Sequence, residues 1–451
     1  MSYFVIKKGK NIKVKGSPSA TIDDRGYPAS LAIHPEDFKG IKPRLLVKVG
    51  QTIKKGDPLF EDKNGTATVI VAPLGGSIKA INRGEKRVLI NVVIDVNPDA
   101  EEVRSEILSA ESSRKDWVDA LQKSGLWAFI RQRPFSKILD PQVEPKSIFV
   151  KALNTEPLAL DLGIVVEGKR DLFQAGLDVL NKLTDGKVHL CYAADTESKV
   201  LRKSEGVEHH TFAGPHPAGN ISTFVSQIDP LRKKEVIAYI DAQDVLRLGF
   251  FAKEGRFYSN KVIALTGEGV VEEKRRYIGT HIGVSISDIV KDGETSLQKE
   301  DLLYISGSVL NGSNIEENGF VRYYHSQVHL LPDKPQRKLL RFFRLGLGEY
   351  TFSKAYLGGF LPRNDVSLDS SINGSDRAIV MNDVYDQYIS LDIYTYFLIK
   401  AILAEQWDEA ESLGLLECDP EDFALASFAC PSKTDVMGII AHGLDSIEKE
   451  G

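Results

Sequence analysis

The stretch from residue 47 to residue 81 constrains the fold more than any other part of this 451-residue chain. Short runs of branched and aromatic residues alternate there with turn signals, among them Gly56-Asp57, Asn64-Gly65 and Gly75-Gly76. Runs this short, broken by turns this often, are typical of a small all-β unit. Because Asn-Gly is a strong hairpin-turn signal, we expect Lys63 at the tip of a short hairpin.

This stretch resembles the barrel-sandwich domains of lipoyl and biotinyl carriers, which bear their cofactor on a lysine at a hairpin tip. In that family the acceptor hairpin is longer and is marked by an Asp-Lys-Ala step, whereas Asp62-Lys63 is followed here by Asn64-Gly65. We therefore expect an ordinary turn and a scaffold role for the unit. A lipoyl-type carrier acting through Lys63 is the alternative, and the intact mass of protein from its native host distinguishes the two.

Composition places the chain among soluble globular proteins, with 42% hydrophobic and 27% charged residues and a net charge of -6. This balance excludes a general nucleic-acid binder, which would carry a basic surface. The most apolar candidate for a membrane span, residues 388–403, is interrupted by Asp392 and Lys400, so we expect no transmembrane segment. No secretory signal is expected at the N-terminus either, and three cysteines are too few for a disulfide framework.

Four domains are expected from the order of the elements. After the β-rich start and a charged helix at residues 100–125, strands at 149–162, 186–194 and 236–240 alternate with helices at 171–183 and 242–248, which favours a parallel α/β sheet. Short strands return at 262–266, 283–286, 302–305 and 328–331, and helices follow at 391–406 and after Ser432, the expected N-cap. The expected domains are a barrel-sandwich (lipoyl-like) region at 1–98, a Rossmann-like α/β domain at 99–258, a β-grasp-like (SLBB) domain at 259–335 and a mostly helical C-terminal domain at 336–451 that resembles a ferredoxin domain without clusters.

The α/β region lacks the glycine-rich loop that a dinucleotide-binding fold needs where its backbone meets the pyrophosphate. No G-x-G-x-x-G occurs, and the entry to this region, residues 125–135, carries bulky and cationic side chains instead. We expect no nucleotide here. Arg131 and Arg133 are expected to meet an acidic partner or a phosphate.

Metal and cluster sites are not expected either. Four-iron clusters normally take four cysteine ligands, and only Cys191, Cys418 and Cys430 are present. His209, His210 and His216 lie in a Pro- and Gly-containing segment whose spacing matches no zinc motif, so a structural or interface loop is the expected role. No catalytic triad or acid–base pair can be assigned.

Several motifs in this order resemble one family, the A subunits of the sodium-translocating NADH:quinone oxidoreductase (Na+-NQR). The resemblance runs over the full length and is carried by Ile6-Lys7-Lys8-Gly9, Arg83-Gly84-Glu85-Lys86-Arg87-Val88, Gly214-Pro215-His216-Pro217-Ala218-Gly219, Asn373-Gly374-Ser375-Asp376-Arg377-Ala378, parts of 381–392, and the ending 444–451. The chain is also similar to the C subunit of Rnf complexes and to the flavin-bearing subunit of respiratory complex I. Those relatives keep a flavin loop, cysteine-ligated clusters or both; Asn154-Thr155-Glu156-Pro157 resembles the acidic segment that follows the flavin loop.

The resemblance implies a peripheral subunit on the cytoplasmic face of the bacterial inner membrane, held by a membrane-embedded B subunit in a six-subunit respiratory complex. That complex oxidises NADH, reduces ubiquinone to ubiquinol and exports Na+. FMN, FAD and the 2Fe-2S centre are expected only in other subunits, and the isolated chain is not expected to be catalytic. The alternative from another class is a free-standing flavin or NAD(P) oxidoreductase with an unusual phosphate loop.

A quinone contact on this chain would need aromatic and apolar walls. Trp127, Phe129 and Phe135 are the candidates from the sequence, and core or interface packing is the competing role for the same three residues. The sequence by itself does not identify the surface that meets the B subunit.

Overall fold

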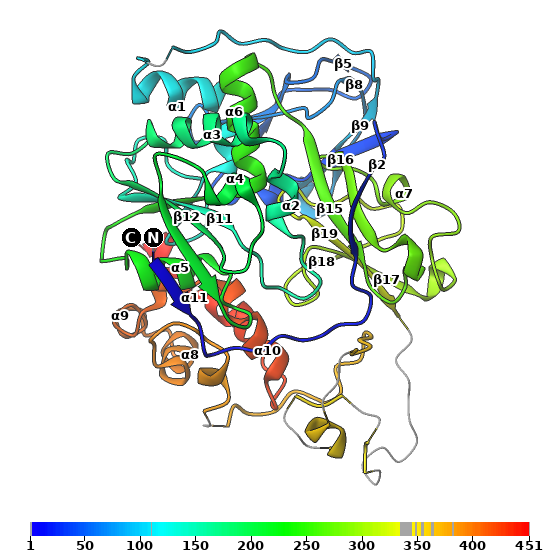
Figure 1. Ribbon diagram of the computed structural model, residues 1–451, viewed down its shortest axis with the longest axis vertical. Coiled ribbons are helices and arrows are strands. Elements are labelled where there is room, and N and C mark those ends of the chain that lie inside the picture. Colours follow the sequence, from blue (N-terminus) through cyan, green and yellow to red (C-terminus); the bar gives the residue numbers. More distant parts are fainter. Residues whose placement is uncertain are drawn as a thin grey trace.

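The computed structural model describes residues 2–109, 111–333, 345–347, 350–352, 356–361, 365–380 and 383–450. Within these ranges the chain forms four β-sheets with helices around them and a helical C-terminal domain, residues 383–450 (Figure 1). The expected domain boundary at 335–336, along with Met381 and Gly451 of the family motifs, lies outside the described residues.

The barrel-sandwich unit consists of two small antiparallel sheets, ordered β3-β9-β8-β5 and β4-β6-β7. Its strands are β3 (Ser30–Ile33), β4 (Pro43–Leu45), β5 (Thr52–Ile53), β6 (Pro58–Asp62), β7 (Val69–Val71), β8 (Gly76–Arg83) and β9 (Leu89–Val96). Ile78 of β8 faces Ile94 of β9 in register, and both are fully buried. The predicted small all-β unit is confirmed.

The first two strands belong to the sheets of later segments. β1 (Ser2–Val5) pairs in parallel with β13 at the edge of the α/β sheet, and β2 (Ser19–Asp24) pairs in parallel with β16 at the edge of the β-grasp-like sheet. The first 24 residues therefore tie the other two β-containing domains together before the barrel-sandwich unit begins.

The α/β domain contains a six-stranded sheet in the order β1-β13-β12-β11-β14-β10, in which only β10 is antiparallel to its neighbour. Its strands and helices are β10 (Arg131–Arg133), β11 (Ser147–Ala152), β12 (Lys187–Ala193), β13 (Glu208–Ala213), β14 (Ile237–Asp241), α1 (Arg114–Lys123), η3 (Leu126–Phe129), α2 (Leu162–Val166), α3 (Arg170–Asn181), α4 (Lys199–Arg202), α5 (Ile221–Ile228) and α6 (Ala242–Glu254). α3 and α6 pack on one face of the sheet and α5 on the other (Figure 1). The order β13-β12-β11-β14 is that of a doubly wound fold, so the predicted Rossmann-like sheet is confirmed.

The β-grasp-like domain contains a mixed six-stranded sheet in the order β18-β17-β19-β15-β16-β2. Its elements are β15 (Asn260–Thr266), β16 (Arg276–His281), α7 (Ile286–Ile289), β17 (Leu302–Ser306), β18 (Ser313–Ile315) and β19 (Gln327–Pro332). The prediction of a strand at residues 283–286 is wrong. Val284 and Ser285 form only isolated bridges, because Ser285 caps α7 by accepting a hydrogen bond from Asp288 N.

The C-terminal domain packs short helices around its own buried cluster, in which Ile399, Leu415, Phe423 and Ile440 are fully enclosed. The helices are α8 (Thr395–Leu403), α9 (Trp407–Ser412), η10 (Pro420–Phe423), α10 (Ala424–Ala429) and α11 (Val436–Glu450). No helix among the described residues is both long enough and apolar enough to cross a bilayer.

The strand expected at 149–162 ends at Ala152, and helix boundaries differ from the expectation at four places. The helix expected at 242–248 continues to Glu254 and ends at the left-handed Gly255. The first helix starts at Arg114 rather than residue 100, because Ser113 and Asp116 form a capping box. The helix expected at 391–406 is limited to α8, and the N-cap of α11 is Asp435, whose carboxylate accepts from Gly438 N at 2.9 Å, rather than Ser432. Each correction comes from a local side-chain hydrogen bond or a turn that periodicity alone does not reveal.

Candidate functional site

The candidate site lies at the carboxyl edge of the α/β sheet, between β11 and β14. The chain leaves β11 toward β12 on one side, and β14 lies on the other side, so this is the topological switch point at which doubly wound folds hold ligands. The loop after β11 (residues 153–156) and Asp241 at the end of β14 face each other there. The hydrogen bonds and charges of these side chains determine whether a nucleotide could bind at this edge.

The helices that follow β11 and β14, α2 and α6, each carry an aspartate at the N-terminus. Asp161 accepts from Gly163 N at 2.8 Å at the start of α2, and Asp241 accepts from Gln243 N at 3.0 Å at the start of α6. Burial, with Asp244 nearby, raises the pKa of Asp241 to about 6. A phosphate at a helix N-terminus needs free N–H groups and a positive local field, and here a carboxylate occupies each position. The geometry therefore opposes a nucleotide phosphate at either helix.

Arg133, which pairs with Ile237 at the start of β14, joins the sheet to the C-terminal domain. Its side chain is 3% exposed and forms ion pairs with Asp419 and, at 2.8 Å, with Glu421. The ring of Tyr239 lies 5.1 Å from the guanidinium carbon. The acidic partner predicted for Arg133 is thus another part of the same chain. Arg131 is held between two aromatic rings, with its guanidinium carbon 4.7 Å from the centroid of Tyr239.

The β-grasp-like domain contacts the loop after β11 through a chain of hydrogen bonds. Gln327 of β19 donates to Glu156 at 3.0 Å, and Asn154 donates to the same carboxylate oxygen at 3.0 Å. Behind Gln327, the ring of buried His329 lies between the Gln327 side-chain oxygen and the hydroxyl of Thr266. Glu156, part of the segment whose sequence resembles the acidic segment of flavin-bearing relatives, thus forms a contact between domains.

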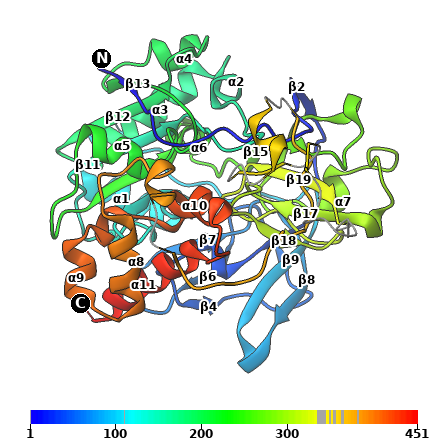
Figure 2. The ribbon, with the colours of Figure 1, turned by 90° about the horizontal axis from the view of Figure 1, so that it is seen from below.

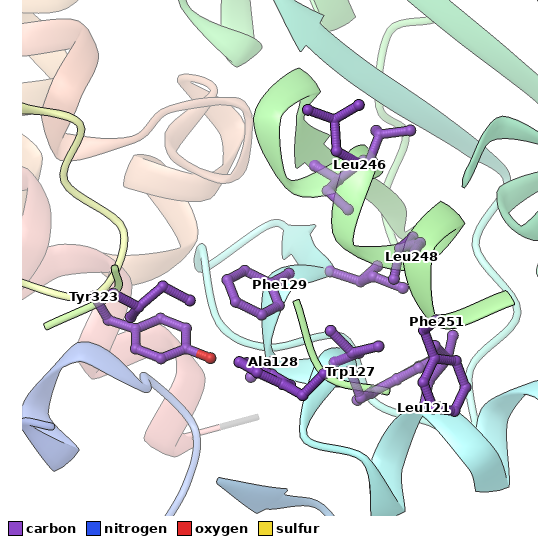
Figure 3. Close-up of a cluster of buried hydrophobic side chains, with 14 of the residues drawn as sticks. Leu121, Trp127, Ala128, Phe129, Leu246, Leu248, Phe251 and Tyr323 are labelled. Atoms are coloured by element: carbon purple, nitrogen blue, oxygen red, sulfur yellow. The ribbon is translucent and has the colours of Figure 1, made fainter. Parts of the chain in front are cut away.

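Trp127 and Phe129 lie in the core where three domains meet (Figure 3). Trp127 is fully buried, and its indole Nε1 donates to the carbonyl oxygen of Leu139 at 2.7 Å. Phe129 is 2% exposed and stacks on Tyr323 of the β-grasp-like domain, with 5.0 Å between ring centroids; Tyr323 in turn contacts Phe38 of the barrel-sandwich unit at 4.7 Å. A quinone would reach either ring only if this core opened, so their contact with quinone stays a prediction.

Phe135 lies in a different place from the other two aromatic candidates. It follows β10, has a positive φ of 76°, and packs half-buried against the hydrophobic cluster of the C-terminal domain. The Lys137 ammonium lies 5.7 Å from its ring centroid. The three predicted residues therefore do not form one wall, and only Phe135 presents a partly exposed ring.

Lys63 is exposed at the tip of the β6–β7 hairpin, as expected, but the hairpin is fixed at its base. The Asp62 carboxylate accepts from Lys42 N at 3.0 Å, from Asn64 N at 3.1 Å and from the Thr66 hydroxyl at 2.9 Å. Gln122 of α1 donates to the Thr66 carbonyl and so ties the tip to the α/β domain. This anchoring favours the scaffold role over a mobile carrier arm.

The three histidines singled out in the sequence do not converge. His209 and His210 are consecutive on β13, so their side chains point to opposite faces of the sheet. Each has its own hydrogen-bond partner: the Ser204 carbonyl at 2.9 Å for His209, His189 at 3.0 Å for His210, and the Thr155 hydroxyl at 3.2 Å for His216. In the part of the chain that the structure describes, no group of three or more His, Cys, Asp or Glu side chains could hold a metal ion.

All three cysteines are buried free thiols. Burial raises the pKa of Cys191 and Cys418, which keeps these thiols protonated and unreactive. The sulfur of Cys430 lies 3.1 Å from the Tyr385 hydroxyl and accepts from Thr434 N at 3.3 Å, so its surroundings are set by the C-terminal core.

The sequence did not identify the residues of the C-terminal domain that bind Arg133 and Asn220 of the α/β domain. By sequence, Asp419, Glu421 and Asp422 are typical of the acidic first turn of a helix, and they do begin η10. Asp422 additionally accepts from Asn220 at the N-terminus of α5, and burial raises its pKa to about 6. The sequence signal for this contact was a run of three carboxylates within four residues, together with two arginines earlier in the chain that had no assigned partner.

Family models match three parts of the chain: the "NqrA N-terminal barrel-sandwich hybrid domain" at residues 4–97, the "NqrA second alpha/beta domain" at 112–257 and the "NQRA C-terminal domain", an SLBB model, at 262–317. The crystal structure of a NAD+-reducing [NiFe]-hydrogenase is similar at 10% identity and a TM-score of 0.34, covering 49% of this chain and 46% of that one. The A subunit of the Na(+)-translocating NADH-quinone reductase is 35% identical in Yersinia pseudotuberculosis and 37% identical in Neisseria meningitidis, with 99% of each chain covered. The chain therefore belongs to the family formed by the A subunits of the Na(+)-translocating NADH-quinone reductases.

Proposed function

We propose that this chain is the peripheral subunit of a sodium-pumping NADH:ubiquinone oxidoreductase of the respiratory chain and supports reduction of ubiquinone coupled to Na+ export. The observation that carries the proposal is its full-length membership of the A-subunit family. In this proposal the chain lies on the cytoplasmic face of the inner membrane and docks on the membrane-embedded B subunit, within a six-subunit complex. Its contribution is assembly and support rather than catalysis by the isolated chain.

The proposal includes that the chain holds no redox cofactor, and that FMN, FAD and the 2Fe-2S centre belong to other subunits. Two features of the α/β domain support this. Asp161 and Asp241 place carboxylates at the two helix N-termini where a nucleotide phosphate would bind, and Arg133 is already paired with Asp419 and Glu421. A free-standing flavin or NAD(P) oxidoreductase would have to displace these contacts.

Removing the chain from the complex tests the proposal. Quinone reduction should fall when the chain is stripped from the complex and recover when it is added back, while NADH oxidation by artificial acceptors persists. Unchanged quinone reduction would refute the role. The purified chain should also be colourless and should bind no nicotinamide nucleotide; a yellow protein would favour the free-standing oxidoreductase.

A contribution to a quinone site is proposed through Phe135, because its ring alone among the three aromatic candidates is partly exposed. Phe135→Ala should raise the KM for quinone in the assembled complex and leave NADH oxidation by artificial acceptors unchanged. A KM equal to that of the wild type would leave Phe135 with only its packing role.

A further inference from the structure

Helices α8 and α9 of the C-terminal domain lie at the outer edge of the molecule (Figures 1 and 2). A large open groove lies between them. Its volume is about 990 Å³. The apolar part of its wall includes Phe397 and Leu403, which are 52% and 57% exposed, together with Ala401, Ala404, Trp407 and Leu413. Large apolar side chains exposed together in this way typically mark an interaction surface.

Three carboxylates line the same groove: Glu405, Asp408 and Glu409. Among the described residues, none of the three forms an ion pair, whereas the acidic side chains of this domain at Asp419 and Glu421 are paired. Asp408 and Glu409 lie in the first turn of α9, where the helix dipole by itself favours acidic residues. Glu405 has no such explanation.

Glu405 occupies a backbone position that usually belongs to glycine. It follows α8 with a φ of 54°, its N–H bonds to the Ile402 carbonyl at 3.0 Å, and the N–H of Gln406 bonds to the Ala401 carbonyl at 2.9 Å. This is the Schellman arrangement, in which the left-handed residue is most often glycine because a Cβ is unfavourable there. A glutamate at this position costs stability and places a carboxylate at the groove.

We propose that this groove binds a segment of the membrane-embedded partner that presents apolar side chains flanked by lysine and arginine. The apolar walls fit the side chains of an amphipathic segment, and the three carboxylates complement its cations. Cytoplasmic segments of membrane proteins carry an excess of lysine and arginine, so such a partner offers the required charge. Lys400, which also lines the groove, lies 5.1 Å from the ring of Tyr396 on its own helix. The inference rests on the proposed function and adds the docking surface to it.

Site-directed cross-linking in the complete complex tests the location. The three native cysteines are buried, so Leu403→Cys introduces the accessible thiol, and Val88→Cys, 64% exposed at the turn between β8 and β9, is the matched control. With a thiol-directed photo-cross-linker, the variant at 403 should attach to a Lys/Arg-containing segment of a membrane-embedded subunit, whereas the control should not. Attachment only to a second copy of this chain, or to no other subunit, overturns the inference.

Two substitutions at Glu405 separate docking from stability. Glu405→Gly relieves the backbone strain, so its thermal stability should equal or exceed that of the wild type, while its affinity for a complex depleted of this chain should fall. Phe397→Ser combined with Glu405→Lys should weaken that affinity by about tenfold or more, as expected for loss of central interface contacts. Wild-type affinity for both variants overturns the groove as the docking surface. If the wild-type chain itself fails to bind the depleted complex, the proposed function fails instead.

Discussion

Arg133 is predicted to be the main electrostatic contact that holds the C-terminal domain on the α/β sheet. Its side chain is 3% exposed and pairs with Asp419, 11% exposed, and Glu421, 25% exposed. Arg133→Met would remove the ion-pair partner of both Asp419 and Glu421, and removing one partner of a buried ion pair costs about 3–5 kcal/mol. Because Glu421 is a quarter exposed and therefore screened by water, we expect a loss near the lower end, about 3 kcal/mol.

Hydrogen exchange followed by mass spectrometry localises this loss. A change of about 3 kcal/mol corresponds to roughly 100-fold less protection, and it should affect residues 395–450 while β11 and β12 keep theirs. Lys137→Met is the control, because the Lys137–Glu448 pair joins the same two domains at 2.6 Å but both side chains are more than a quarter exposed. Its expected cost is under about 1 kcal/mol.

Replacing all three charges distinguishes loss of the ion network from loss of packing. The triple variant Arg133→Met, Asp419→Asn, Glu421→Gln buries no uncompensated charge and should regain more than half of the stability lost by Arg133→Met. The reasoning is refuted if Arg133→Met changes protection of the C-terminal domain by less than about threefold. It is also refuted if the triple variant is no more stable than the single one.

Three further predictions concern other parts of the chain. Gly249→Ala should lower the free energy of unfolding, measured in urea, by about 3 kcal/mol, because the new Cβ would lie 1.8 Å from the Leu172 carbonyl oxygen where α6 packs on α3. Alanine usually stabilises a helix relative to glycine, so a higher free energy of unfolding would contradict this close contact. Burial lowers the pKa of His329 to about 3, so between about pH 6.5 and pH 3 only the unfolded state binds a proton at this residue. The contribution of His329 to stability is therefore complete above pH 6.5 and is lost as the pH falls below it. His329→Gln should flatten the slope of the unfolding free energy against pH. The intact mass of the protein from its native host should equal that of the unmodified chain, and an added lipoyl or biotinyl mass on Lys63 would contradict the anchored hairpin.

The local sequence pattern was sufficient to predict those strands and helices whose own apolar residues define one buried face. The expected strands and helix around β12, β14 and α3 are confirmed because their apolar residues are contiguous or helically spaced and all face one core. The element boundaries failed where a side chain competes with the backbone. Ser113 and Asp435 are the N-caps that set where α1 and α11 begin. The periodicity of apolar residues does not indicate which of several nearby polar residues will be the N-cap.

The sequence by itself determined the family, the all-β start, the parallel α/β sheet and the absence of a glycine-rich phosphate loop, since each depends on residue types close together in the chain. Only the tertiary structure decided which side chains join the domains. Arg133 and Asp419 are 286 residues apart, and Glu156 meets Gln327 across 171 residues. It also decided that Trp127 and Phe129 belong to a core shared by three domains, whereas Phe135 faces the C-terminal domain. The physical reason is that desolvation and pairing depend on neighbours in space, and those neighbours come from domains whose relative placement no local pattern encodes.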